Sequence, residues 1–137
     1  SPEEARQNYQ EWLEMSHLGE LATPPNDWSF DALSDHLIDY AINAGEMRAV
    51  KAVQDGWNEF MNQLRLRTPL AVDGVIGPKT LAAILDCTAD QRDALAAYVF
   101  ADRLRHYGRI TRDHPDPNAK FIAGWLNRMA TLAEKWA

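Results

Sequence analysis

Apolar residues recur along this chain at intervals of three and four, which is the period of one face of an α-helix. Two stretches show it most clearly, one from about residue 46 to 66 and one from about 122 to 136. The first carries Val50, Val53, Trp57, Phe60, Met61 and Leu64, and the second carries Ile122, Trp125, Leu126, Met129, Leu132, Ala133 and Trp136. No stretch alternates with the period of two that is typical of a half-buried strand. The pattern therefore predicts an all-α fold.

Helix-start signals predict two helices in the first third of the chain. Ser1, Pro2 and Glu4 suit a capping box with proline at the first helical position, and this helix should fade near residues 17–19. A loop with two consecutive prolines follows at 22–27. A second helix is expected to start near Asp27 or Ser29.

Three further signals complete the expected helices. Gly45 ends the second helix as a left-handed cap, and the third helix follows directly from Glu46. Gly56 inside that helix costs about 1 kcal/mol relative to Ala, so we expect a close helix crossing there. A capping box at Thr88 begins a long helix that reaches Gly108 or Ile110, and residues 112–118 are expected to form a loop. The expected architecture is about six helices around a single core, in one domain from residue 1 to 137.

The segment 72–80 interrupts the helical pattern with two glycines and a proline. Asp73-Gly74 favours a turn, because glycine accepts a positive φ without steric cost. Gly77-Pro78 predicts a helix start, which the apolar run 80–85 continues. Val75 and Ile76 between them are expected to be a buried apolar pair.

Charge is distributed unevenly along the chain, whose net charge is −6. Residues 1–46 contain ten acidic residues and one base, which gives −9, whereas residues 103–128 contain six bases and two acids, which gives +4. The overall acidity argues against nucleic-acid binding. Two interpretations of the asymmetry stay open: ion pairing between the two ends, and a polar cleft with one acidic and one basic wall.

Several classes of protein are disfavoured by what the sequence lacks. Cys87 is the single cysteine, so no internal disulfide can form, and it is expected to pack as a small apolar group. No apolar run approaches the about 20 residues of a membrane span, and we expect no signal peptide. The four histidines do not have the spacing of a zinc site, and we predict no metal and no cofactor.

Three motifs, in order, carry a resemblance to a known family. They are Asp39-Tyr40-Ala41-Ile42-Asn43-Ala44-Gly45, Asp73-Gly74-Val75-Ile76-Gly77-Pro78-Lys79-Thr80 and Gly124-Trp125-Leu126-Asn127-Arg128. The second is similar to the Asp-Gly-x-x-Gly-x-x-Thr signature of small helical peptidoglycan-binding domains. Together they resemble the C-terminal part of glycoside hydrolase family 108, the lysozyme-like endolysins and secretion activators, over about residues 1–128.

This resemblance implies a lysozyme-like helical lobe that recognises peptidoglycan or a muropeptide. It implies a bacterial or phage protein that acts on the cell wall, either in the cell envelope or periplasm or as a phage-encoded cytoplasmic protein. In that family the catalytic acid is expected in a Glu-Gly-Gly-Tyr-like segment, which this sequence does not contain. We therefore expect the chain to lack the N-terminal catalytic lobe of a muramidase that hydrolyses the glycan β-1,4 bond.

Polar residues of the second predicted helix are the first candidates for ligand contact. His36, Asp39 and Asn43 share one face, and Asp35 lies four residues before Asp39. Carboxylate and amide groups bond well to sugar hydroxyls, although a solvated helix face is the alternative. Asp39 with Glu46 or Asp35 is also a weak candidate for the two carboxyl groups of a glycosidase.

A second candidate set lies near the C-terminus and consists of Arg103, Tyr107, Asn127 and Arg128. Arginine suits the carboxylates that both muramic acid and the stem peptide carry. Exposed groups of the turn segment, Asp73, Lys79 and Thr80, are further candidates, although a purely structural role is expected for most of that segment.

The tryptophans fall into two groups. The helical period places Trp57, Trp125 and Trp136 in the core, while Trp12 and Trp28 are freer to face a ligand.

Three functions follow from these observations. The first is peptidoglycan recognition without catalysis. The second is a protein-interaction or secretion-associated module, for which the acidic N-terminal third favours a basic protein partner. The third is an intact small glycosidase that uses Asp39 and Glu46.

Overall fold

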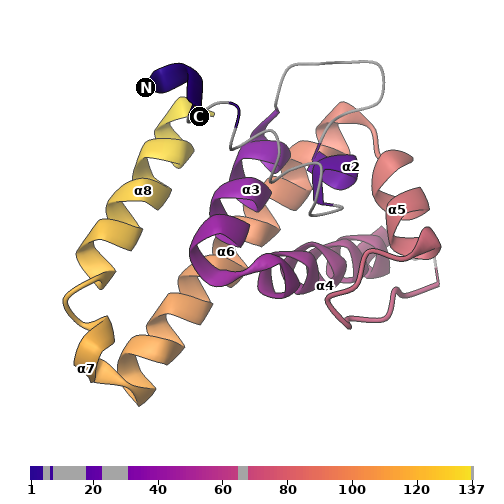
Figure 1. Cartoon of the computed structure of the whole chain (residues 1–137). Coiled ribbons are helices and arrows are strands. Elements are labelled where there is room, and N and C mark those ends of the chain that lie inside the picture. Colours follow the sequence, from indigo (N-terminus) through magenta and orange to yellow (C-terminus); the bar gives the residue numbers. More distant parts are fainter. Residues whose placement is uncertain (5–6, 8–17, 23–30, 65–67, 137) are drawn as a thin grey trace.

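The computed structural model describes residues 1–4, 7, 18–22, 31–64 and 68–136. Within these ranges the chain forms helices and no strand, which confirms the all-α prediction (Figure 1). The helices are α2 (Leu18–Ala22), α3 (Ala32–Ala44), α4 (Glu46–Leu64), α5 (Pro78–Leu85), α6 (Ala89–Asp113), α7 (Pro115–Asn118) and α8 (Ile122–Lys135).

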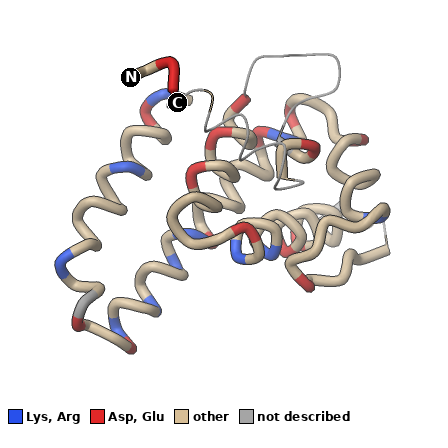
Figure 2. The backbone as a smooth tube through the Cα atoms, viewed as in Figure 1, with Lys and Arg blue, Asp and Glu red and all other residues tan. Residues whose placement is uncertain are grey.

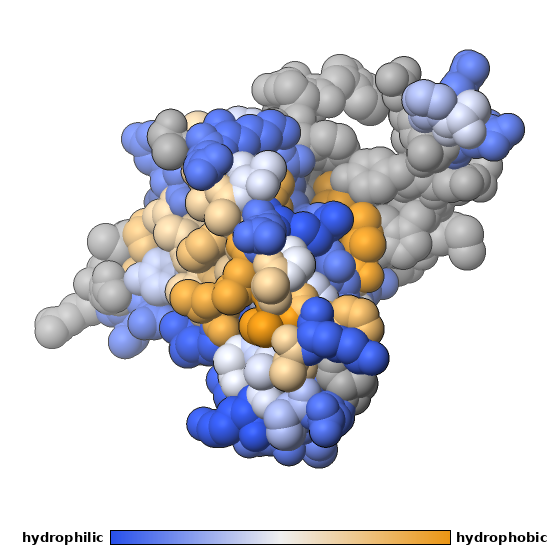
Figure 3. Space-filling view, turned by 90° about the vertical axis from the view of Figure 1, so that its left-hand side faces the viewer, coloured by the Kyte–Doolittle hydropathy of each residue, from blue (hydrophilic) through white to orange (hydrophobic). Residues whose placement is uncertain are grey.

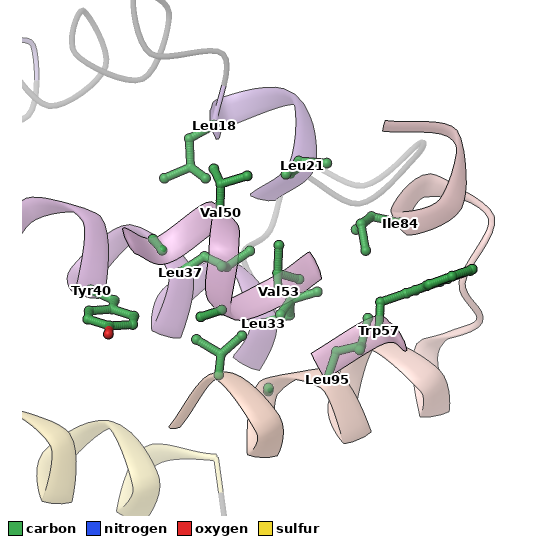
Figure 4. Packing of buried hydrophobic residues seen from close by; sticks show 14 of the residues in the cluster. Leu18, Leu21, Leu33, Leu37, Tyr40, Val50, Val53, Trp57, Ile84 and Leu95 are labelled. Carbon is green, nitrogen blue, oxygen red and sulfur yellow. The ribbon is translucent and has the colours of Figure 1, made fainter. Parts of the chain in front are cut away.

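Three helices, α3, α4 and α6, pack against one another and form the centre of the molecule. The short helices α2 and α5 pack at one side, and α8 lies along the opposite side (Figure 1). Leucine and valine side chains fill the space between them, as Figure 4 shows for Leu33, Leu37, Val50, Val53 and Leu95. All five are fully buried, so one core holds α2 to α6 together.

Local signals in the sequence correctly predicted most of the helix starts. Ser1 Oγ accepts a hydrogen bond from Glu4 N–H at 3.2 Å, and Thr88 forms both hydrogen bonds of a capping box with Gln91. Pro78 occupies the start of α5, as expected. Most of the first predicted helix, most of the loop 22–27 and the helix start at Asp27 or Ser29 lie outside the described residues. The expected fading near residues 17–19 and the loop start at Ala22 were wrong, because α2 is helical from Leu18 to Ala22. The next helix, α3, begins at Ala32 with Asp31 as its cap.

Gly56 marks the close crossing of α4 and α6 that the sequence predicted. A Cβ atom added there would lie 2.7 Å from Tyr98 Cβ, which is closer than packed carbon atoms come. A larger residue at this position would therefore force the two helices apart.

The prediction that the second helix ends at Gly45 was confirmed, but the conformation of that cap and the end of α6 were predicted wrongly. Gly45 has φ +95° but ψ 152°, so it uses the positive φ open to glycine without adopting the left-handed helical cap. Residues 112–118 are not a simple loop, because α6 continues to Asp113 and α7 follows. Asn118 Nδ2 donates to the carbonyls of Ile110 and His114, which joins α7 to the end of α6.

Two burial predictions also failed. Val75 is 59% exposed, and only Ile76 of the expected pair is partly buried. On α8 the apolar stripe is present, but Met129 is its one buried member within the described residues, and Trp136 is 38% exposed. Figure 3 views the side on which α8 lies, and apolar surface is visible in the middle of that face.

Ion pairs between the two ends of the chain account for part of the charge asymmetry. Acidic residues of α3 and its cap lie opposite bases of α6 and α8 (Figure 2). Asp31 pairs with Arg92, Asp35 with Lys135, and Asp39 with Arg128. The ion-pairing interpretation is confirmed for Asp39, which pairs with Arg103 and Arg128 of the basic segment 103–128. The partners of Asp31 and Asp35 lie outside that segment.

Candidate functional site

The turn segment is held to α4 by one buried side chain, Gln54. Its Oε1 accepts from the backbone N–H groups of Asp73 and Gly74 at 3.1 and 3.0 Å. Its Nε2 lies 3.0 to 3.1 Å from Asp73 Oδ1, Val75 O and Thr80 Oγ1. We call these five residues, Gln54, Asp73, Gly74, Val75 and Thr80, the Gln54 cluster. The cluster explains why the Asp-Gly-x-x-Gly-x-x-Thr segment adopts one conformation.

Gly74 and Asp73 make the turn of this cluster. Gly74 has φ +76°, which favours glycine, and an added Cβ would collide with Met47 Cγ. Backbone conformation and packing are therefore two separate reasons for glycine at this position. Asp73 Oδ1 also accepts from Val75 N–H at 3.0 Å. These backbone and Gln54 hydrogen bonds hold the pKa of Asp73 below its ordinary value. The carboxylate is thus already engaged by its own segment.

A cavity of about 690 Å³ lies next to this cluster, between the C-terminal half of α4, α5 and the start of α6. We call it the α4–α5 cavity, and its volume lies within the range of ligand pockets. Its lining residues are Trp57, Met61, Thr68, Pro69, Leu70, Lys79, Ala82, Ala83, Asp86, Cys87 and Gln91. One wall is fixed by Asn58, whose amide donates to Leu70 O at 2.8 Å and accepts from Leu70 N–H at 2.6 Å.

The α4–α5 cavity combines an apolar floor with charged groups at its edge. Trp57, Met61 and Leu70 are buried, whereas Lys79 and Asp86 are exposed. The indole N–H of Trp57 has no hydrogen-bond partner within the described residues. Lys79 forms no ion pair in the same part of the chain. An exposed cation without an ion pair in those ranges is a group that a ligand carboxylate can satisfy.

The predicted residues of α3 and the C-terminus meet elsewhere, between α3, α6 and α8. Asp39 Oδ2 lies 2.7 Å from Arg103 Nη1, and Arg128 Nη2 donates to Asp39 Oδ1. One turn earlier, Asp35 Oδ2 accepts from Lys135 Nζ at 2.7 Å and from Trp136 Nε1 at 2.9 Å. We call Asp35, Asp39, Arg103, Arg128, Lys135 and Trp136 the Asp39 cluster. It joins α8 to the rest of the fold.

Arg103 lies at the centre of the Asp39 cluster and is fully buried. Its Nε donates to Tyr107 Oη at 2.9 Å, and its guanidinium carbon lies 5.5 and 5.2 Å from the ring centres of Tyr40 and Tyr107. The Tyr107 ring is in turn stacked on Trp125, with centroids 4.8 Å apart. Trp125 is thus half-buried against an aromatic partner on α6.

Burial on its own would raise the pKa of Asp39, but the hydrogen bond from Arg128 and the Arg103 guanidinium outweigh it and hold that pKa below its ordinary value. An ionised carboxylate with a cation at each oxygen is poorly suited to donate a proton. This geometry does not support Asp39 as the general acid of a glycosidase.

The other predicted candidates are separate from these groups or bonded locally. Asn43 Nδ2 donates to Asp39 O within its own helix and is exposed, and Asn127 is exposed on α8. His36 is buried and lines a second cavity, described below. Lys79 and Asp73 lie near α5, on the opposite side of the core from α8 (Figure 1). Asp73 and Lys79 therefore lie far from the candidates on α3, α6 and α8, and the ten predicted residues do not form one cleft.

Sequence reasoning missed a further buried ion pair. Asp102 on α6 accepts from Tyr40 Oη at 3.1 Å and from Arg48 Nη2 at 3.1 Å. Burial, followed by the charge of Asp102, raises the pKa of Tyr40, so its phenol stays protonated. Asp102 and Arg48 look like ordinary surface charges of two helices, and no local signal pairs them.

The described ranges contain neither a cluster of metal-binding side chains nor a membrane-spanning helix. No group of three or more His, Cys, Asp or Glu side chains there is arranged to hold a metal ion. None of the helices in those ranges has the length and apolar character needed to span a bilayer.

Comparison with known proteins gives one match. A family model described as a predicted peptidoglycan domain matches residues 48–130, more than half of the chain. No curated protein and no solved structure matches the chain. The matched range contains every residue that lines the α4–α5 cavity, whereas α3, with Asp35 and Asp39, precedes it.

Proposed function

The chain belongs to the family of predicted peptidoglycan domains, and on this premise we propose that it binds peptidoglycan in the α4–α5 cavity. The observation that carries the proposal is the coincidence of that cavity with the family match. All of its lining residues lie within residues 48–130, and the Gln54 cluster that fixes its neighbouring turn lies there too.

The chemistry of the cavity suits the peptide part of peptidoglycan. Stem peptides carry carboxylates and apolar side chains, and the cavity offers the Lys79 ammonium group beside the apolar floor of Trp57 and Met61. A carboxylate bound by Lys79 would place the neighbouring methyl groups over that floor. The indole N–H of Trp57 is a further donor for a peptide carbonyl.

The finer assignment is also a proposal. The resemblance to glycoside hydrolase family 108 supports a role as the non-catalytic part of a muramidase, with the glycan β-1,4 bond cut elsewhere in the parent protein. The doubly paired Asp39 favours binding over hydrolysis within this chain. A purified chain that clears a suspension of cell walls would contradict this assignment.

Retention on insoluble peptidoglycan tests the proposal. Lys79→Gln removes the cation, and Ala82→Leu fills the cavity from an exposed position of α5, so each should lower retention about tenfold. Lys120→Gln and Ala130→Leu are matched controls at exposed positions outside the cavity and should bind like the natural sequence. If the chain were retained on peptidoglycan no better than serum albumin, the proposal would be wrong.

One observation favours a second candidate, a protein-interaction module. Large apolar side chains stay exposed on α8 and the turn before it, at Phe121, Leu126 and Trp136. Surfaces of this kind often bind protein partners. A chain that ignores peptidoglycan but forms a complex weakened by Leu126→Gln would favour this alternative.

A further inference from the structure

A second cavity, of about 470 Å³, lies between α3, α6 and α8. We call it the α3–α8 cavity. It is lined by Asp31, Ala32, His36, Asp93, Ala96, Ala97, Phe100, Ala133 and Trp136. The family match ends at residue 130 and begins at residue 48, so both α3 and the end of α8 contribute residues from outside it. Its chemistry differs from that of the α4–α5 cavity, because its lining residues in the described ranges include no Lys or Arg.

Trp136 forms an oriented aromatic wall of this cavity. Its Nε1 donates to Asp35 Oδ2 at 2.9 Å, and Lys135 Nζ lies 5.0 Å from its ring centre. Lys135 also pairs with the same Asp35 oxygen at 2.7 Å. The indole is therefore held by α3 although it stands at the end of α8. Apolar ring faces of this kind pack against the C–H faces of sugar rings.

The floor of the α3–α8 cavity consists of small side chains, one aromatic ring and the buried His36. Four alanine methyl groups, from Ala32, Ala96, Ala97 and Ala133, line it together with Phe100, leaving room for a small apolar substituent. His36 is 5% exposed, packs edge-on against Phe100 at 5.6 Å, and its Nδ1 has no hydrogen-bond partner among the described residues. Burial, followed by the charge of Arg103, lowers the pKa of His36, which keeps the ring neutral.

The charged groups of the cavity disfavour an anionic ligand. Asp93 is exposed at the edge, and Asp31 is already paired with Arg92 at 2.5 Å. A carboxylate-bearing stem peptide would meet these carboxylates without a compensating cation among the described lining residues. The Asp93 carboxylate could instead accept hydrogen bonds from the hydroxyl or amide N–H groups of a neutral ligand.

We propose that the α3–α8 cavity binds an N-acetylated sugar of the glycan strand, with the acetamido methyl group against the alanine floor and the sugar ring on Trp136. This inference rests on the proposed function, because it assigns the sugar part of the same polymer to a second site. In this proposal the chain binds the stem peptide in the α4–α5 cavity and the glycan strand in the α3–α8 cavity, on opposite sides of the core.

Titration of the ¹⁵N-labelled chain with the β-1,4-linked trimer of N-acetylglucosamine tests the inference. Shifts are expected at the amides of His36 and Ala97 and at the Trp136 indole, and not around Lys79 and Ala82. The same trimer without its acetyl groups should bind about tenfold more weakly. Equal or tighter binding of the deacetylated trimer would overturn the acetamido assignment in favour of a cation bound by Asp93.

A variant pair separates occupancy of the cavity from loss of folding. Ala97 is exposed on α6, so Ala97→Leu fills the cavity without entering the core and should weaken trimer binding about tenfold. Ala130→Leu on α8 is the control and should leave binding unchanged. Unaltered trimer binding by Ala97→Leu, or shifts confined to the α4–α5 cavity, would overturn the inference.

The two proposals fail in different ways. A chain that is retained on peptidoglycan and depends on Lys79, yet ignores the trimer, keeps the proposed function and loses this inference. A chain that binds the trimer at Trp136 but is not retained through Lys79 loses the proposed peptide site and keeps the sugar site.

Discussion

The Gln54 cluster and the Asp39 cluster both join segments that are distant in sequence, but they do so with opposite chemistry. Gln54 is a neutral, fully buried amide. It bonds to backbone groups 19 to 21 residues away and to the side chains of Asp73 and Thr80. Asp39 is a half-buried carboxylate whose partners are two arginines, one buried and one exposed. Each cluster also lies beside one of the two cavities.

The difference lies in what each cluster positions. The neutral Gln54 amide holds the turn segment, and the one carboxylate in its cluster, Asp73, has its pKa held below the ordinary value. We therefore expect salt and moderate acid to change this turn little. Ion pairs attach α8, whose apolar stripe is mostly unburied, so this helix depends on charge for its position. We therefore expect the α4–α5 cavity to be the more rigid site and the α3–α8 cavity to be sensitive to solution conditions.

The largest expected effect comes from Asp39→Asn. It leaves the buried Arg103 guanidinium without its counter-charge and should lower the free energy of unfolding by about 3 kcal/mol. Asp35→Asn is the matched control, because its partner Lys135 is 57% exposed, and it should cost less than about 1 kcal/mol. Urea unfolding of both variants measures the difference. Equal losses of unfolding free energy in the two variants would show that the burial of Arg103 does not determine how much the Asp39 cluster stabilises the fold.

A somewhat smaller loss, about 2 kcal/mol, is expected for Gln54→Ala. This change leaves the backbone N–H groups of Asp73 and Gly74 without their acceptor and frees Thr80. The loss should be the same at low and high salt, whereas the loss caused by Asp39→Asn should shrink as salt rises. Asn62→Ala, at an exposed position of the same helix, should change stability by less than about 0.5 kcal/mol. If the loss of stability caused by Gln54→Ala also changed with salt, the two clusters would not differ in the way we expect.

The sequence predicted the two clusters unequally, and the reason is the range of each signal. Caps such as Thr88 and helix starts such as Pro78 depend on neighbours within four residues, so they were predicted correctly. Gln54 looks like an ordinary polar position of an amphipathic helix, and its role depends on a turn about 20 residues away. It was therefore missed, although the turn it holds was recognised.

Asp39, Arg103 and Arg128 were all singled out from the sequence, but as ligand-binding groups. Their pairing depends on how α3, α6 and α8 pack, which no local pattern specifies. Helical periodicity likewise gives the apolar face of α8 but not whether a partner covers it. For this reason the predicted burial of Trp136 was wrong, while that of Trp57 was confirmed.

Glycine substitutions on α4 and α8 are expected to change the free energy of unfolding in opposite directions. Gly56→Ala places a methyl group 2.7 Å from Tyr98 Cβ and should destabilise the fold by about 1–2 kcal/mol, despite the better helix propensity of Ala. Gly124→Ala on α8 meets no atom within 4 Å and should stabilise by about 0.5–1 kcal/mol. Thermal unfolding of the two variants checks the signs. A stabilising Gly56→Ala would mean that the α4–α6 crossing can open without cost.

The smallest expected effect is a loosening of α8 between about pH 7 and pH 5, the range in which histidine titrates. His36 has its pKa below the ordinary 6.5 because of burial and then Arg103, while Asp35 and Asp39 act in the opposite direction. A lowered pKa in the folded state means that the stabilising contribution is complete above 6.5 and is lost as pH falls through the lowered value. Asp39 and Asp73 have pKa values below their ordinary 3.8 and stay ionised in this window. His106 on α6 also has its pKa lowered, by burial and then by the charge of Arg48, so a His36 variant is needed to separate the contribution of His36. Amide exchange of α8 should therefore rise relative to that of residues 73–80, and His36→Gln should remove most of the rise. An equal rise in both segments would indicate global unfolding and would place the pH sensitivity outside the α3–α8 interface.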